Sequence, residues 1–382
     1  FATKAVEAFT AVLLAFGGGT LWLTYGRRWH GLRWPAALFA DWAVVVMSIF
    51  IASPAEAPEG FRNLSPSLAL LLALGLVILY IGSFVLRILR RERSLNPFEI
   101  AQTVAVLVAG FGGAARMAHV LGSGVGPFGI GALVVALACY GLSFSLVEKH
   151  QEGGNNFVYF TSLALIFMLV GSPMILPHTA LSLTYGAFGI LTAGLGVHFS
   201  RNILVAHSAV YLSVAALVSG TVGSALAAFG SATVPALPPM PVQAIVILAC
   251  LIGTHLFLVL QKQHETLPWT HRLPSFAVGT WGVLGVGAFV VAVGVQLVGS
   301  TATDPGALAA LRTGILAITA VGLALAARKF PASEIGWLVH PVLVATGLKF
   351  LLEDLPKGRP LTLFLAFTFY GIALLVAPRL MK

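Results

Sequence analysis

The sequence is poor in charge, and above all in acidic residues. Only 9% of its 382 residues are charged, with 13 acidic against 22 basic side chains, whereas 58% are hydrophobic and the mean hydropathy is +0.95. A soluble domain of ordinary composition carries about 25% charged residues. The scarcity of charge excludes a soluble globular protein and predicts an integral membrane protein.

The long apolar runs contain few polar interruptions. Residues 67–86 and 242–261, for example, contain no formally charged side chain. About 20 such residues in an α-helix cross the roughly 30 Å of hydrocarbon in a bilayer. A transmembrane barrel would instead show segments of about ten residues with alternating hydrophobicity. The continuous runs therefore predict an all-α polytopic membrane protein.

Cysteine and the motifs of common enzymes are scarce or missing. The two cysteines, Cys139 and Cys250, lie inside apolar runs, where cysteine behaves as a small hydrophobic residue. The sequence contains no CxxCH, HExxH, GxxxxGK[ST] or GxSxG motif. The basic residues lie in short clusters between apolar runs and are not interleaved with aromatic residues, which argues against nucleic-acid binding. The sequence therefore favours a role other than that of an enzyme.

The order of apolar runs and breaks predicts thirteen membrane spans in one transmembrane domain, 1–382. The predicted spans are 5–26, 34–53, 67–87, 98–121, 128–148, 157–175, 178–198, 202–228, 241–261, 275–298, 307–327, 335–352 and 361–377. Twelve of them form six helical hairpins in one orientation, and the last helix closes the domain. The hairpins are about 1–60, 61–125, 126–177, 178–235, 236–302 and 303–356, and the last helix is 357–382. Because the chain begins at Phe1, a further segment is expected before it.

The basic residues are concentrated in alternate loops. Under the predicted spans, 15 of the 22 basic residues fall on one side of the membrane, the side of the C-terminus. The positive-inside rule makes this side cytoplasmic and leaves the N-terminus outside. The predicted topology anchors, which also suit contact with anionic lipid headgroups, are Arg27, Arg28, Arg87, Arg90, Arg91 and Arg93.

Ionisable side chains inside the spans are candidates for function, because charge in hydrocarbon is expensive. Asp41 lies eight residues after Arg33, about 12 Å into the membrane. It is either a proton or cation site, or a carboxylate that is paired with a neighbouring helix or protonated in place.

Arg116 and His119 share a helix face near the outer end of their span. They either hold an anionic headgroup or substrate carboxylate, or are a snorkelling arginine and a capping histidine.

A second charged group lies near the end of the twelfth span. Lys349 is followed by Glu353 four residues later and by Asp354. Residues four apart on a helix are neighbours on its surface. The spacing predicts an ion pair at the helix end that faces the outer surface.

Three histidines lie at similar depth in different spans. His207, His255 and His340 are each about 8–11 Å from the predicted cytoplasmic boundary. Two of them could ligate a b-type haem, or all three a metal ion, since neutral imidazole is a ligand for both. The His-Pro step at 340–341 offers a local backbone explanation for His340. No cofactor is otherwise predicted.

Small residues recur within the predicted helices. Glycines cluster at 17–19, at 110–113 and at 279–287. Small residues allow helices to approach closely in lipid, where packing replaces the hydrophobic effect between helices. These clusters predict tight helix packing, with a hinge or a backbone-lined passage as the alternative.

The C-terminal part of the chain resembles one group of bacterial membrane proteins. The segment EIGWLVHPVLVATGLKFLLEDLPKGRPLTLFLAFTFYGIALLVAPRL, 334–380, is similar to uncharacterised bacterial multi-pass membrane proteins built from repeated helical hairpins. The resemblance implies a bacterial cytoplasmic (inner) membrane protein. It carries no diagnostic motif and assigns no functional residue.

Three functions fit these observations. The first is a non-catalytic membrane subunit or scaffold of a larger assembly. The second is a transporter or flippase for a hydrophobic or lipid-like substrate, and the third is a haem- or quinone-associated membrane component. The expected partners are membrane lipids and either other subunits of a membrane complex or further copies of the chain.

Overall fold

The protein is helical throughout the part that its structure, a computed structural model, describes. The described residues are 6–26, 31–58, 61, 63–91, 96–122, 124–147, 154–230, 240–261, 272–298, 304–329 and 333–381. Every regular element within these ranges is a helix. Within the described residues, twelve helices or unbroken runs of helices are long and apolar enough to cross a membrane, and one bent pair would make a thirteenth span. The predicted all-α polytopic membrane fold is thereby confirmed.

Contacts between helices divide the chain into two compact units, Phe1–Ile175 and Leu176–Lys382. The boundary between them falls beside the predicted end of the third hairpin. The first unit contains α1 (Val6–Gly26), α2 (Arg33–Ala52), α3 (Pro66–Arg91), α4 (Pro97–Val106), η2 (Leu107–Gly112), α5 (Gly113–Val120), α6 (Gly126–Leu142), η3 (Ser143–Val147), α7 (Gly154–Gly171) and η4 (Ser172–Met174). The elements α4, η2 and α5 follow one another without a break, and η2 is a π-helical turn within this one span.

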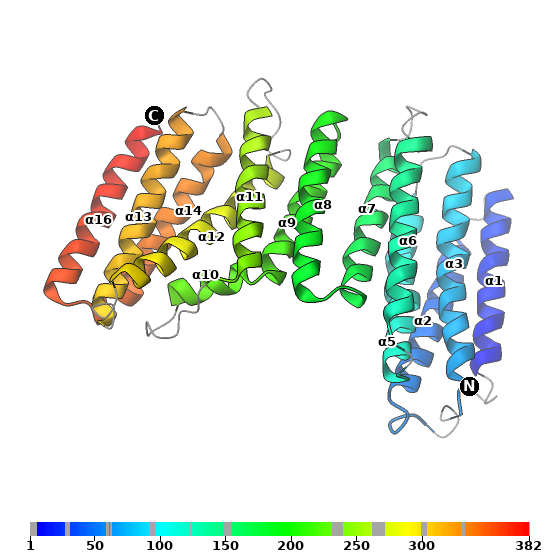
Figure 1. Cartoon of the computed structure of the whole chain (residues 1–382). Coiled ribbons are helices and arrows are strands. Elements are labelled where there is room, and N and C mark those ends of the chain that lie inside the picture. The colour runs from blue at the N-terminus through cyan, green and yellow to red at the C-terminus, as the bar shows by residue number, and fades with distance from the viewer. Residues whose placement is uncertain are drawn as a thin grey trace. The chain divides into compact units, whose positions relative to one another are not determined.

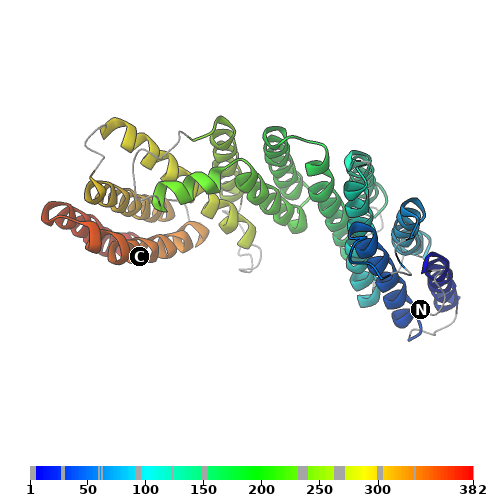
Figure 2. The ribbon, with the colours of Figure 1, turned by 90° about the horizontal axis from the view of Figure 1, so that it is seen from below.

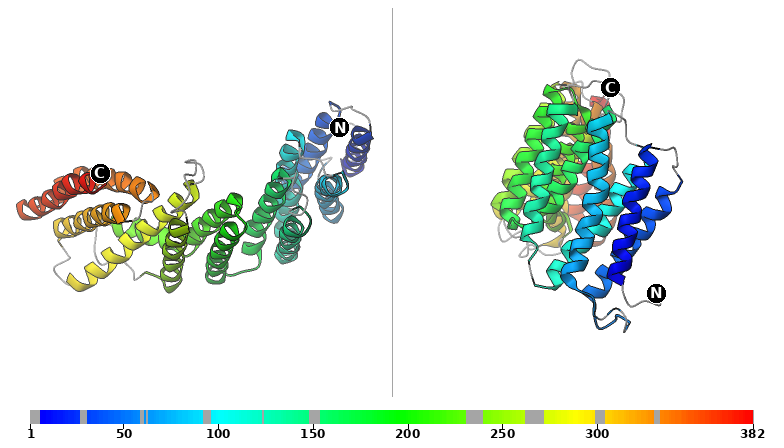
Figure 3. Two further views of the ribbon diagram at one scale, coloured as in Figure 1. Left: turned by 90° about the horizontal axis from the view of Figure 1, so that it is seen from above. Right: turned by 90° about the vertical axis from the view of Figure 1, so that its right-hand side faces the viewer.

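Within the first unit, α1 lies beside α2 and α3 (Figure 3). The long span α4–η2–α5 packs against both α2 and α3, while α6 and α7 pair with each other. Gly129 of α6 and Gly171 of α7 meet at the crossing of the last pair, because a Cβ atom on Gly171 would lie 2.9 Å from the carbonyl oxygen of Gly129. Such contact between backbones requires glycine on both helices.

The second unit contains the remaining helices. They are α8 (His178–His198), α9 (Asn202–Val218), α10 (Thr221–Gly230), α11 (Val242–Gln261), α12 (Leu273–Val298), α13 (Pro305–Lys329), α14 (Ser333–Lys349), η9 (Phe350–Asp354), α15 (Leu355–Lys357) and α16 (Pro360–Leu380). Helix α13 packs against both α14 and α16 (Figures 1 and 2). Helices α8 and α9 form a close antiparallel pair, in which Gly189 leaves room for the side chain of Leu212.

The predicted eighth span, 202–228, is broken into α9 and α10, which meet at an angle of 60°. Figure 1 shows α10 lying across the direction of its neighbours α9 and α11. The chain turns at Gly220, whose φ of +84° is a left-handed conformation that glycine adopts without a Cβ clash. The hydroxyl groups of Ser219 and Thr221 lie 2.8 Å apart across this turn. Hydropathy alone did not reveal the break, because both segments are apolar.

Candidate functional site

Asp41 is buried within the first unit, whereas Arg116 and His119 are exposed on α5. Gly113, one turn before Arg116, faces Ser48 of α2. Ser48 lies seven residues past Asp41, which is about 10 Å along the helix. The structure therefore does not bring Asp41 together with the other two residues into one polar site.

The partner of Asp41 is a glutamine on a neighbouring helix. The side-chain nitrogen of Gln102, on α4, donates to both carboxylate oxygens of Asp41, at 3.0 and 2.9 Å. Asp41 is 8% exposed and Gln102 5%. The buried hydroxyl of Tyr80, on α3, has no hydrogen-bond partner among the described residues and interacts electrostatically with Asp41. Three helices thus contribute polar groups to one buried place.

One helical turn from Gln102, the start of α4 carries an ion pair. Arg87 donates to the carboxylate of Glu99 at 2.7 Å. The same carboxylate accepts from the backbone of Asn96, whose side chain in turn accepts from the backbone of Glu99, so the two residues form a capping box. Arg87 therefore has a structural partner as well as its predicted place as a topology anchor.

The structure describes the other predicted anchors only in part. Arg90 and Arg91 lie in the last turn of α3, and their side chains are outside the described part. Arg27, Arg28 and Arg93 lie outside the described residues altogether. Their anchoring role, and the orientation of the termini, stay predictions.

The three histidines have different surroundings. His340 is exposed on α14, and His255 lies 2.9 Å from the carbonyl oxygen of Ser275 on α12 through its Nδ1 atom. His207 is buried on α9, and its Nδ1 has no hydrogen-bond partner among the described residues. Within the described part, no three His, Cys, Asp or Glu residues are grouped so that they could hold a metal ion. A haem held by two of the histidines stays a prediction.

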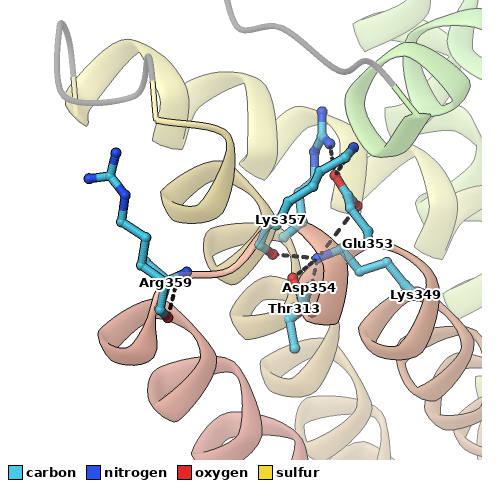
Figure 4. Close-up of polar contacts among 9 residues, drawn as sticks. Thr313, Lys349, Glu353, Asp354, Lys357 and Arg359 are labelled. Carbon is cyan, nitrogen blue, oxygen red and sulfur yellow. Dashed lines mark hydrogen bonds and ion pairs between the residues drawn. The ribbon is translucent and has the colours of Figure 1, made fainter.

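The largest cluster of charged side chains in the described part lies in the second unit, between α13 and the end of α14 (Figure 4). Arg312 donates to Glu353 at 2.8 Å, and Lys349 donates to Asp354 at 2.8 Å. Lys349 also donates to Thr313 at 2.7 Å and to the carbonyl oxygen of Ala309. We call Arg312, Thr313, Lys349, Glu353 and Asp354 the α13–α14 ion network.

This network is buried. The side chain of Arg312 is 0% exposed, that of Asp354 2% and that of Lys349 11%. Lys349 and Glu353 form the predicted pair at 3.6 Å. The pair does not stand alone at the helix end, because α13 covers it and supplies both Arg312 and Thr313. The side of the membrane that the pair faces stays a prediction.

A π-helical turn directs the side chains of Glu353 and Asp354 toward Lys349 and α13. Residues Phe350–Asp354 form the π-helical turn η9, which interrupts the α-helical spacing between α14 and α15. Glu353 and Asp354 are consecutive, yet both reach Lys349 or α13. π-helical turns within α-helices are frequent at functional sites.

An apolar cavity of about 420 Å³ adjoins this network. Its lining comes from α10, α12, α13 and α14, and among the described residues Lys349 contributes the only charged side chain to it. The apolar lining residues are Val222, Ala225, Leu226, Phe229, Leu284, Leu316 and Ala345. Trp281 also lines the cavity, and its ring nitrogen donates to Ser213 of α9 at 2.9 Å.

Sequence reasoning found Asp41, Lys349, Glu353 and Asp354 but missed the residues on other helices that contact them. Gln102 is uncharged, and Arg312 is a single basic residue inside an apolar run. The signal that could have identified Arg312 is its place in a predicted span, seven residues after Pro305 and about 10 Å from the helix end.

Known proteins offer no guide to these sites. No protein-family model matches the chain, and no characterised protein or solved structure is significantly similar to it. Its function is therefore argued from the polar groups and the cavity alone.

Proposed function

We propose that the protein binds an amphipathic, lipid-like molecule with an anionic head group in the second unit and transports it across the membrane. The observation that carries the proposal is the place of Lys349, which belongs to a buried ion network and also lines an otherwise apolar cavity. Ligand sites of this kind are largely apolar, with a few polar groups that orient the ligand.

The cavity suits the two parts of such a molecule. Its volume of about 420 Å³ falls within the range of roughly 300–1,000 Å³ that is typical of small-molecule sites. Aliphatic and aromatic side chains of α10 and α12 would contact the hydrocarbon part, and the ammonium group of Lys349 would attract a phosphate or carboxylate head group.

The three N–H donors of Lys349 already serve Ala309, Thr313 and Asp354. An entering anion would therefore replace one of these contacts. The carboxylate of Asp354 is the acceptor that would leave, because it carries the same charge as the anion and is repelled by it. Binding would in this way weaken the link between Lys349 at the end of α14 and Asp354 in η9, the residue that also accepts from Thr313 of α13. A ligand that changes such a contact favours one arrangement of the helices over another.

The broken span supports transport rather than binding alone. Thr221 begins α10 directly after the turn at Gly220 and is part of the cavity lining. Discontinuous membrane helices in transporters commonly border the substrate site. The alternative interpretation of the break, a helix that merely lies along the membrane surface, does not require a cavity beside it.

The test is lipid translocation by the purified protein in phosphatidylcholine vesicles that contain fluorescent phosphatidylglycerol. Dithionite added outside quenches only the outer leaflet, so translocation appears as the loss of protected fluorescence. The variant Ala345→Phe fills the cavity without changing a charge, and we expect it to reduce the rate at least tenfold. Gly131→Phe, in an apolar pocket of the first unit that lacks a charged residue, is the matched control.

Two results would contradict the proposal. One is a wild-type rate equal to that of protein-free vesicles, and the other is an unchanged rate in Ala345→Phe. A fluorescent phosphatidylcholine probe tests the role of Lys349, because its zwitterionic head group should be transported more slowly than phosphatidylglycerol.

A non-catalytic subunit of a larger assembly is the second candidate. Helix α16 supports it, since only 17% of its span is buried within the described structure. Its large exposed side chains include Leu361, Phe364, Phe367 and Leu375, which contact either lipid or another protein. Native mass spectrometry of protein released gently from its own membranes separates the two candidates. Stoichiometric additional subunits would favour the assembly, and a monomer or homo-oligomer with bound anionic lipid would favour transport.

A further inference from the structure

Asp41 carries a carboxyl group inside a membrane span, and the described side chains provide no cation for it. Both of its oxygens accept from the neutral side chain of Gln102, and it forms no ion pair within the described part of the chain. It is 8% exposed, in a span that begins at Arg33. An unpaired carboxylate in such a place carries a large desolvation penalty, which protonation removes.

Among the described side chains, the charged groups on α2 and on the helices packed against it do not supply the missing cation. These groups are Glu7, Arg33, Arg87, Glu99, Arg116 and His119, whereas the side chains of Arg90 and Arg91 lie outside the described part. The guanidinium group of Arg33 lies over the ring of Phe98, 4.5 Å from its centre. Glu7 accepts from the backbone of Ser65, and Arg87 is paired with Glu99. Arg116 and His119 are exposed on α5, at the other end of α2.

The pairing with Gln102 suits a protonated carboxyl group. An ionised Asp41 can only accept from the amide nitrogen, whereas a protonated one can also donate to the amide oxygen. A small rotation of the amide then gives a cyclic pair with one O–H···O and one N–H···O bond. In the structure both carboxyl oxygens lie at near-equal distances, 3.0 and 2.9 Å, from the same amide nitrogen, so the cyclic pair forms once the amide turns its oxygen toward one of them.

Polar side chains lie between Asp41 and the end of the span that adjoins the predicted basic loops. Gln102 lies three residues after Glu99 on α4, about 4.5 Å along the helix. Glu99 and Arg87 occupy the turn nearer the helix start, and the Tyr80 hydroxyl adds a further buried polar group. A proton can therefore approach Asp41 from the end of the span that the basic loops mark.

We propose that Asp41 is a reversible proton-binding site, which in the resting protein carries the proton on a carboxyl oxygen and is held by Gln102. The site lies in the first unit. Its test is therefore independent of the cavity in the second unit and of the transport proposal.

Infrared spectroscopy of the protein in lipid nanodiscs tests this directly, because a protonated carboxyl group has a C=O stretch that a carboxylate lacks. We expect such a band at neutral pH, and we expect it to weaken as the pH is raised. Asp41→Asn should remove it. Glu99→Gln is the matched control, since Glu99 is equally buried but paired with Arg87, and this variant should leave the band unchanged.

A second variant keeps the test decisive if Asp41→Asn does not fold. Gln102→Leu removes the hydrogen bonds to the carboxyl group and should move the band to higher frequency without removing it. Carboxylate bands alone at neutral pH, or a band lost in Glu99→Gln, would overturn the proposal. So would a band that disappears when sodium replaces a large organic cation in the buffer, since the site would then bind a metal cation.

Discussion

The buried pair of Arg312 and Glu353 provides the sharpest test of how the second unit is held together. Their side chains lie 2.8 Å apart, and Arg312 is fully buried. Removing one partner of a buried ion pair typically costs about 3–5 kcal/mol, because a charge is left without compensation. In Arg312→Met, Glu353 would still lie 3.6 Å from Lys349 and 3.8 Å from Lys357. We therefore expect a loss near the lower limit, about 3 kcal/mol.

The double variant Arg312→Met, Glu353→Gln separates the pair from the packing around it. Neither side chain is then charged, so no buried charge remains uncompensated. We expect the double variant to be more stable than the sum of the two single changes predicts, by about 2 kcal/mol. The free energy of unfolding can be measured in mixed micelles by circular dichroism during titration with a denaturing detergent.

The matched control is another ion pair of the same unit. Arg359 lies 3.4 Å from Asp304, but its side chain is 74% exposed. Exposed pairs contribute about 0–1 kcal/mol, so Arg359→Met should change the stability by less than about 1 kcal/mol. A loss in Arg312→Met no larger than this would refute the view that the buried network stabilises α13 against α14.

Three further predictions concern the backbone and its caps. Gly110→Val should reduce the thermal stability by several degrees, because a Cβ there would lie 2.9 Å from a backbone oxygen of α3, whereas Gly112→Ala, with no contact closer than 3.6 Å, should be tolerated. Gly220→Ala should cost about 1 kcal/mol of unfolding free energy, since the φ of +84° disfavours a Cβ, and Gly223→Ala in α10 should stabilise the protein. Asn96→Ala should cost about 0.5–2 kcal/mol by removing the N-cap of α4, as measured by denaturant titration.

The membrane spans could be predicted from the sequence because a lipid bilayer permits very few backbone conformations. A run of about 20 apolar residues can satisfy its backbone in hydrocarbon only as a helix. The predicted start and end of most spans therefore lie close to those observed, for example 98–121 against Pro97–Val120. The π-helical turn inside this span left no signal in hydropathy, because it changes the hydrogen-bond spacing and not the composition.

The break between α9 and α10 depends on one backbone conformation. The predicted span 202–228 contains Gly220, but helices tolerate glycine, and glycines recur in many spans of this chain. What distinguishes Gly220 is its positive φ next to two hydroxyl residues that interact across the turn. The flanking Ser219 and Thr221 were visible in the sequence, but the angle of the turn follows from tertiary packing.

The predicted glycine packing is borne out unevenly. Gly110 lies against the backbone of α3, and Gly279 and Gly285 leave room for His255 and Leu248, respectively. Gly19, in contrast, has no neighbour within 4 Å of the position of a Cβ. Composition identifies helices that can approach closely, but it does not say which face of the helix meets a partner.

The charged residues show most clearly what a single sequence conveys. The spacing of Lys349 and Glu353 indicates an i, i+4 pair, and such a pair on a helix surface contributes only about 0.3–0.5 kcal/mol. Arg312, 41 residues before Glu353, changes that estimate, because it places the same carboxylate against a second helix and out of water. A pair that would matter little at the surface thereby becomes part of a network whose disruption leaves a buried charge. The contribution of these residues to stability therefore depends on a contact between distant helices, and no periodicity within either helix predicts it.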